Sequence, residues 1–212
     1  NFLVAQGYSF EMRGFKKEVP FRICAETVTL KGKKFTTELT LRNVDIRLHP
    51  FMLSLAFKSE VLGGRLEGRF KVFNGLSAEI KDADIEPLCR ALGFQGQGFL
   101  SGKVIDNKFQ FKVKDAIFQD VVLANNYIPL SAFSEVKGVL VMQGDVILIN
   151  PLSLESKDGY ARINGKITEN EIKGIIEFMP TLDAQWQSLL GNYRLKERYY
   201  RIPLRISIVK RE

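Results

Sequence analysis

A strand, a tight turn and a returning strand occur twice in succession, over Gly64–Ala83 and again over Gly98–Ala116. The turn falls at Asn74-Gly75 in the first copy and at Asp106-Asn107 in the second. In both copies apolar residues or glycines occupy every second position, and charged or polar residues fill the positions between them. This period of two is typical of an antiparallel hairpin with one apolar and one solvated face. The repeat therefore predicts a sheet that must cover an apolar face.

Two glycines flank a leucine on the apolar face of each copy, Gly64 and Gly68 around Leu66, and Gly98 and Gly102 around Leu100. Glycine weakens a strand, so its presence there usually marks a bend or the close approach of another group to the backbone. The pattern predicts a sheet that curls with its apolar face inward. Ordinary curvature glycines with no ligand are the alternative interpretation.

The rest of the chain carries the same alternation. The predicted strands and hairpins include an entry strand within 2–15, strands over 21–30 and 35–48 joined across Lys31-Gly32-Lys33, a pair over 136–149 broken at Gly144-Asp145, a hairpin of 160–167 with 172–179, and a closing strand over 199–209. Within 35–48 the apolar residues change parity at Arg42-Asn43, which predicts a β-bulge. Links of hairpin length between successive strands indicate a meander.

Two segments predict short helices, Asp84–Gly93 and Asp183–Gly191, each with an acidic cap candidate at the start and a glycine at the end. Helices this short cannot cover a large sheet. We therefore expect an all-β fold: a single curled, meandering antiparallel sheet with two short helices and a groove-like apolar face. A chain of 212 residues with this pattern is expected to form a single domain over 1–212.

The composition restricts the classes of partner. The net charge is +7 and the sequence pI is about 9.4, which suits an anionic membrane surface, an acidic protein or a nucleic acid. The cations are spread over the polar strand faces, as solvated faces would also have them. The aromatic residues, 16 Phe with six Tyr and one Trp, fall on the apolar pattern and not among the cations. That placement argues against nucleic-acid binding.

Side chains for catalysis are sparse. The one histidine, His49, lies beside Pro50 with no adjacent nucleophile, and no zinc, phosphate-loop or dinucleotide motif is present. We expect no enzyme activity, no metal and no cofactor. Cys24 and Cys89 fit no metal spacing and would be either a disulfide in an oxidising compartment or two buried thiols. No run of 18 apolar residues occurs. Since the chain begins at Asn1, we expect that an N-terminal membrane anchor has been removed.

Several segments together resemble the family of type II secretion system protein N, which is similar to the wider group of AsmA-like periplasmic proteins. They are the repeated Gly-x-Leu-x-Gly strands, Leu-Arg-Asn-Val-Asp-Ile-Arg-Leu at 41–48 before Gly-Gly-Arg-Leu-Glu-Gly at 63–68, Val-Lys-Gly-Val-Leu at 136–140, Leu-Ser-Leu-Glu-Ser-Lys-Asp-Gly at 152–159 and Ile-Asn-Gly-Lys-Ile at 163–167. The resemblance implies an inner-membrane protein of a Gram-negative bacterium with a periplasmic β-sheet body, linked to protein secretion, lipid binding or lipid transport.

From the alternation and the resemblance we expect a non-enzymatic periplasmic module whose apolar groove holds phospholipid or lipopolysaccharide acyl chains. The groove candidates are the apolar-face residues of the repeats and of one further strand: Leu66, Phe70, Val72, Leu76, Ile80, Leu100, Val104, Phe109, Phe111, Val113, Leu140 and Met142. Basic residues at the rim would meet lipid phosphates. Two alternatives stay open. The same side chains could form a dry core within a closed sandwich or barrel, or the protein could be a scaffold that binds other secretion or envelope subunits by strand addition.

Overall fold

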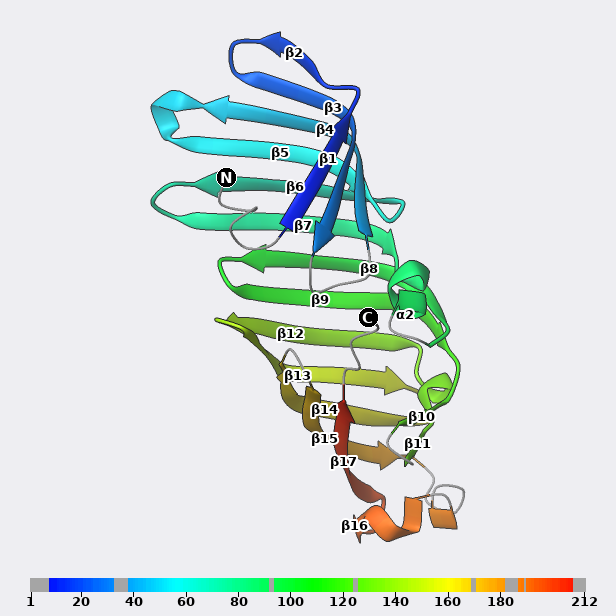
Figure 1. Cartoon of the computed structure of the whole chain (residues 1–212). Helices are drawn as coiled ribbons and strands as arrows, with labels where there is room; N and C mark the ends of the chain where they lie inside the picture. The colour runs from blue at the N-terminus through cyan, green and yellow to red at the C-terminus, as the bar shows by residue number, and fades with distance from the viewer. Residues whose placement is uncertain are drawn as a thin grey trace. The chain divides into compact units, whose positions relative to one another are not determined.

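A computed structural model describes residues 8–32, 38–91, 94–123, 126–168, 171–181, 187–188 and 190–207 (Figure 1). The strands in chain order are β1 (Tyr8–Arg13), β2 (Lys16–Val19), β3 (Arg22–Gly32), β4 (Glu38–His49), β5 (Ser54–Val61), β6 (Gly64–Lys71), β7 (Gly75–Asp84), β8 (Gly96–Ile105), β9 (Lys108–Phe118), β10 (Val121–Leu123), β11 (Asn126–Ile128), β12 (Glu135–Gln143), β13 (Val146–Ser156), β14 (Gly159–Ile167), β15 (Glu171–Pro180), β16 (Arg194–Lys196) and β17 (Tyr199–Ser207). The helical elements are η1 (Pro50–Met52), α2 (Glu86–Ala91), η2 (Leu130–Ala132) and η3 (Gly191–Tyr193).

The strand order follows the chain in an antiparallel sheet that is curled and not closed, so the expected all-β meander is confirmed. Two compact units make up the chain: unit 1 is Asn1–Pro87 with Leu100–Asp106, and unit 2 is Leu88–Phe99 with Asn107–Glu212. Unit 1 has the order β1-β3-β4-β5-β6-β7, with β2 also paired to β3. Unit 2 has the order β9-β12-β13-β14-β15-β17-β16 and a separate β10-β11 pair. The residues of β8 divide between the units.

Unit 1 turns a corner within β3 and β4. The first residues of β3 pair with β2 and its last residues with β1, and β1 lies at a steep angle to β5 and β6 (Figure 1). On β4, Asn43 and Val44 stand opposite the single residue Ser59 of β5, and Asn43 has a φ of 50°. This is the β-bulge predicted at Arg42-Asn43. The buried core of the corner contains Ala25, Val28 and Val44, with Leu30, Leu41 and Ile46 packed against it.

The core of unit 2 lies where β14, β15 and β17 meet the η2 segment. Phe178 of β15 has its ring centroid 5.9 Å from that of Phe133 at 80°, and 6.2 Å from that of Tyr200. The cavity left among these side chains and their apolar neighbours has a volume of about 10 Å³. This is the lower limit of the space that one water molecule needs, so this end of unit 2 is a dry, filled core.

The hairpins predicted over 21–48, 136–149 and 160–179 form as β3-β4, β12-β13 and β14-β15, and the closing strand forms as β17. The first predicted helix forms as α2, where the Asp84 Oδ1 atom accepts a hydrogen bond of 2.8 Å from the Glu86 N–H. This hydrogen bond from residue i+2 to an aspartate side chain satisfies a backbone N–H at the start of the helix, which gives the Asp84 carboxylate a structural role. The second predicted helix lies largely outside the described residues, although Gln187, Ser188 and Leu190 are helical.

The glycines of the repeat mark close approaches within the protein. A Cβ atom on Gly64 would lie 2.5 Å from the Ala83 backbone nitrogen, and one on Gly68 would collide with the Phe57 ring. Both neighbours belong to the sheet itself. Gly64 lies against the backbone of β7, and Gly68 is covered by the Phe57 ring of the adjacent strand β5. These glycines therefore have a structural explanation that requires no ligand.

Asp115 on β9 has a left-handed backbone conformation beside a small buried residue, and its replacement tests the reason for that conformation. It has a φ of 51°, precedes the buried Ala116 and is itself exposed. Aspartate tolerates this backbone region and glycine occupies it freely, whereas alanine is strained there. We expect Asp115→Ala to lower the free energy of unfolding by about 1 kcal/mol and Asp115→Gly to leave it nearly unchanged, as measured by urea denaturation. Equal losses in both variants would contradict this explanation.

Candidate functional site

The candidate site is the apolar face of unit 1 across β4 to β7. The register places side chains in lateral rows on one side of these strands. Leu48, Leu55, Phe70 and Leu76 form one row, and Ile46, Phe57, Gly68 and Ala78 form the next. A third row holds Ser59, Leu66 and Ile80. We call these rows the apolar face of unit 1.

Exposure on this face changes along the strands. At the corner, Val44 is 6% exposed and Ala83 is 0% exposed. At the opposite ends of the same strands, which we call the loop end, Leu48 is 47%, Phe70 46% and Leu76 36% exposed. Leu66 and Ile80 in the third row are half-buried. The apolar face is thus closed at the corner and open to solvent at the loop end.

Unit 2 has the same gradient. On β9 and β12 the register pairs Val136 with Val113, Gly138 with Phe111 and Leu140 with Phe109. Val113 and Val136 are buried, whereas Met142 at the far end of β12 is exposed. The Phe109 and Phe111 rings stack with centroids 5.3 Å apart at 22°. Phe111 also covers Gly138, since a Cβ atom there would lie 2.6 Å from its ring.

The structure divides the predicted groove residues between the two units. Those in unit 1 are Leu66, Phe70, Val72, Leu76, Ile80, Leu100 and Val104, and those in unit 2 are Phe109, Phe111, Val113, Leu140 and Met142. Leu100 and Val113 are buried and so belong to the filled ends of their strands. Phe70, Val72, Leu76 and Met142 are exposed, and the remaining candidates are half-buried. Only the exposed and half-buried candidates can meet a ligand without displacing core side chains.

Leu48, Leu55 and Phe57 share the rows of the predicted residues but are absent from the sequence-based set. Their strands lie outside the duplicated hairpins, so the repeat could not point to them. The signal that could have found them is the alternation Ile46-Leu48 and Leu55-Phe57, which continues the same period into β4 and β5.

No family model, curated protein or solved structure matches this chain. The residues of the sheet are therefore the only ground for a function beyond the resemblance noted in the sequence.

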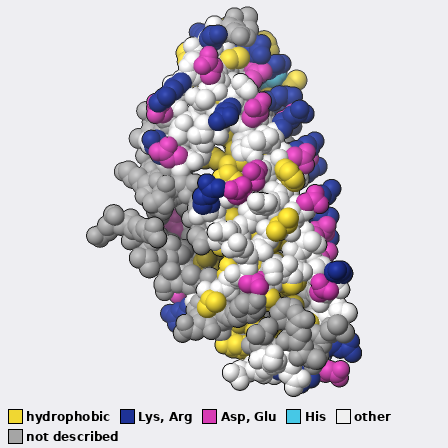
Figure 2. All heavy atoms as spheres, turned by 90° about the vertical axis from the view of Figure 1, so that its right-hand side faces the viewer, with side chains coloured by type: hydrophobic (Ala, Val, Ile, Leu, Met, Phe, Trp, Pro, Cys, Tyr) yellow, Lys and Arg dark blue, Asp and Glu magenta, His cyan; other side chains and the backbone are white. Residues whose placement is uncertain are grey.

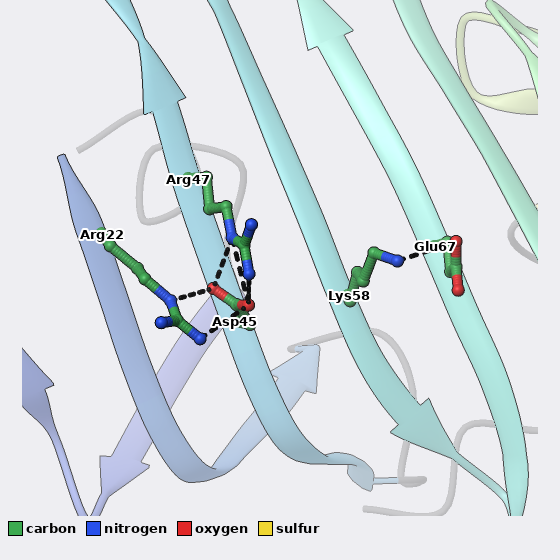
Figure 3. Close-up of polar contacts among 5 residues, drawn as sticks. All are labelled: Arg22, Asp45, Arg47, Lys58 and Glu67. Atoms are coloured by element: carbon green, nitrogen blue, oxygen red, sulfur yellow. Dashed lines mark hydrogen bonds and ion pairs between the residues drawn. The ribbon is translucent and has the colours of Figure 1, made fainter.

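The polar face of the sheet is covered by ion pairs. Lys and Arg side chains are interspersed with Asp and Glu side chains in Figure 2. In unit 1, Asp45 accepts hydrogen bonds from Arg22 and Arg47, and Lys58 pairs with Glu67 at 3.4 Å (Figure 3). In unit 2, Lys112 and Lys137 each approach Glu135 at 2.6 Å, and their hydrogen bonds lower the pKa of Glu135 to about 2. Alternating charges of this kind suit a solvated face.

The dependence of protein stability on pH tests the role of the Asp45 carboxylate on this polar face. Hydrogen bonds from Arg22 and then from Arg47 lower the pKa of Asp45. A lowered pKa stabilises the fold above the unfolded-state pKa of about 3.9, and this stabilisation is lost as the pH falls through the folded-state pKa. We expect Asp45→Asn to cost no more than about 1 kcal/mol at pH 7, because solvent screens the exposed Arg47. The difference between wild type and variant should vanish in acid.

That comparison is made by urea denaturation of both proteins between pH 7 and pH 3. Lys58 and Glu67 provide a control pair with greater exposure, so Glu67→Gln should change stability less than Asp45→Asn does. A cost of Asp45→Asn that stays constant with pH would contradict the assigned role of the carboxylate.

The described residues include the histidine and both cysteines of the chain. No group of three or more His, Cys, Asp or Glu side chains within them is placed to hold a metal ion. Cys24 and Cys89 are not bonded to each other; Cys89 is buried, as one alternative expected, whereas Cys24 is half-buried. His49 is exposed at the start of η1. Across the part of the chain that the structure describes, every helix is too short or too polar to cross a bilayer.

Proposed function

We propose that this protein is a non-enzymatic envelope component that holds acyl chains of phospholipid or lipopolysaccharide on the apolar face of its sheet. One observation carries the proposal: the apolar side chains become progressively more exposed from the corner to the loop end of unit 1. A dry core that filled the whole face would bury the loop end as it buries the corner. An apolar ligand that covered Leu48, Phe70 and Leu76 would remove this exposed surface from water.

The energetics of such binding require no specific polar contact. Each methylene transferred from water to an apolar surface contributes roughly 0.8 kcal/mol before the costs of association. A chain of about eight methylenes would therefore contribute roughly 6 kcal/mol, of which immobilisation removes a substantial part. Apart from Ser59 and Gly68, the rows of the apolar face are made of aliphatic and aromatic side chains, which suits acyl chains of many lengths.

The place of the protein in the cell rests on the sequence resemblance. Under this proposal it is periplasmic, attached to the inner membrane of a Gram-negative bacterium, and part of the type II secretion machinery or a related AsmA-like lipid pathway. The open, curled antiparallel sheet is compatible with that assignment. A sheet of this kind does not by itself specify a pathway.

Lipid analysis of the purified protein tests the proposal. The protein is prepared without detergent, weighed by native mass spectrometry, and extracted with solvent for identification of bound lipid. Co-purified phospholipid or lipopolysaccharide at near-stoichiometric amounts is the expected result. A protein free of lipid, which also fails to take up an added fluorescent fatty acid, would overturn it.

A second function is favoured by the edge of unit 1. The β1 strand pairs along its whole length with β3 and with no other described strand, so its other edge is unpaired within that part of the chain. Such an edge can accept an extended segment of another protein by strand addition. A scaffold for other secretion or envelope subunits would use this edge. We would adopt this function if the lipid analysis gave a protein with neither bound lipid nor fatty-acid uptake.

A further inference from the structure

Three connections of unit 1 carry apolar side chains at the loop end of the strands. They are Phe21 between β2 and β3, Pro50–Leu53 between β4 and β5, and Val72-Phe73 between β6 and β7. The Leu53 carbonyl accepts a hydrogen bond of 3.1 Å from the Val72 N–H, which holds the second and third connections together. The Phe21 carbonyl accepts one of 2.8 Å from the Leu48 N–H. We call Phe21, Phe51, Met52, Leu53, Val72 and Phe73 the loop patch.

The side chains of the loop patch extend into solvent. Phe51 is fully exposed, and Phe73 is 84% exposed. Leu53 has a φ of 43° and a ψ of 47°, in the left-handed region where glycine or asparagine would be less strained. Leu53 is 50% exposed, so only part of its side chain packs against the fold in this strained conformation. A cluster of exposed phenylalanines and a strained exposed leucine indicates a surface that another apolar phase covers.

Two exposed cations, Arg69 and Lys71, lie beside the loop patch, and one carboxylate, that of Asp106, lies against Gly75. Residues 46–59 and 68–78, which contain two of its three connections, include Arg47, Lys58, Arg69 and Lys71. Arg47 pairs with Asp45 and Lys58 with Glu67, so the cations that could face a ligand are Arg69 and Lys71. Arg69 and Lys71 are exposed and have no acidic partner in the described part of the chain. Many other cations of the sheet are paired with carboxylates, as Lys112 is with Glu135. This local excess of cations complements an anionic surface.

We propose that the loop patch inserts into the headgroup region of an anionic membrane, with Arg69 and Lys71 contacting lipid phosphates. Apolar loops flanked by cations bind the interface through buried area and attraction to anionic lipid together. The inference rests in part on the proposed function, because the exposed row of Leu48, Phe70 and Leu76 begins beside the loop patch. An acyl chain that leaves the bilayer there would meet the apolar face without crossing water.

Vesicle co-sedimentation tests the proposal. The protein is mixed with vesicles of phosphatidylcholine alone or with added phosphatidylglycerol, and the bound fraction is measured over a range of salt concentrations. Wild type should bind the anionic vesicles, and more weakly as the salt concentration rises. The double variant Phe51→Ser, Phe73→Ser should bind at least about tenfold more weakly, because each phenylalanine loses its apolar burial.

Two further variants separate the contributions. Phe99→Ser is the matched control, since Phe99 is 51% exposed but lies outside the loop patch, and its binding should equal that of wild type. Arg69→Gln with Lys71→Gln should weaken binding about fivefold per charge and reduce the dependence on salt. These charge variants alter only exposed side chains, so they test the proposal even if the phenylalanine variant folds poorly.

Binding of the phenylalanine and charge variants equal to that of wild type would overturn the proposal. A wild-type dimer in light scattering that the Phe51→Ser, Phe73→Ser variant abolishes, without vesicle binding, would also overturn it in favour of a contact between two copies. If a loop-patch variant loses vesicle binding but still takes up fatty acid, the result supports membrane insertion by the loop patch independently of the proposed function. Vesicle binding by a wild-type protein that never contains or takes up lipid would leave the loop patch standing and refute the proposed function.

Discussion

Replacing Phe178 with alanine is expected to lower the free energy of unfolding by about 3–5 kcal/mol. The side chain is 3% exposed and lies among Phe133, Tyr200 and Ile202 at the filled end of unit 2. Because the cavity there already measures only about 10 Å³, the neighbouring side chains have no loose packing to redistribute, and the deleted ring leaves a void. The T-shaped contact with Phe133 is lost as well.

Urea denaturation followed by circular dichroism measures this loss, with Phe99→Ala as the matched control. Phe99 is 51% exposed, so its removal should cost less than about 1 kcal/mol. A similar small cost at Phe178 would show that the end of unit 2 near η2 is loosely packed. In that case this end, too, would have to be considered as ligand space.

The second large effect concerns the open end of unit 1. We expect Phe70→Asp to weaken the binding of a fluorescent fatty acid at least about tenfold while leaving the fold intact. Phe70 is 46% exposed, so a charge there remains hydrated in the free protein. An acyl chain that covers Leu55, Phe70 and Leu76 would have to remove that charge from water, at a cost that exceeds the gain from a methylene or two.

A titration of the fatty acid into both proteins gives the comparison, and circular dichroism establishes that the variant is folded. Phe70→Leu is the conservative control, since it keeps an apolar side chain in the row and should bind the probe within about threefold of wild type. A folded Phe70→Asp variant with unaltered affinity would place the acyl chain elsewhere and would contradict the proposed use of this face.

The strands and their faces could be predicted from the sequence because alternation is local information. The hairpins of 21–48, 136–149 and 160–179 and the bulge at Arg42-Asn43 all follow from the spacing of apolar residues, and all are confirmed. The corner of unit 1 was harder to predict from the sequence. Its signal is a basic residue, an Asn or Asp with positive φ, and a small buried residue, found at 42–44 and 81–83; the same triplet recurs in unit 2 at 114–116. Only at 42–44 is the triplet flanked on both sides by long runs of alternating apolar residues. The shift of those residues from odd to even positions is therefore visible in the sequence only there.

The exposure gradient that defines the candidate site could not be predicted from the sequence. Alternation places Leu66, Phe70 and Leu100 on the same face but does not indicate what covers each of them. That depends on where β3 and β4 turn and on which distant segments pack at one end of the strands, and both are properties of tertiary structure. Ser59 illustrates the limit, since a serine in the alternation predicts a polar face although its side chain is buried on the apolar face.

Most strands of the sheet pair with the strands that precede and follow them in the chain. A hairpin can therefore be added or removed without changing how the other strands pair. The two copies of the repeat fold as β6-β7 and β8-β9, which are consecutive in the strand order. A duplicated hairpin can enter such a meander by pairing with the strand before it and the strand after it, without any change in the remaining register. Gain or loss of one hairpin would lengthen or shorten the exposed apolar rows by two strands. If the proposed function holds, related sheets could differ in the length of acyl chain that they cover through the number of hairpins alone.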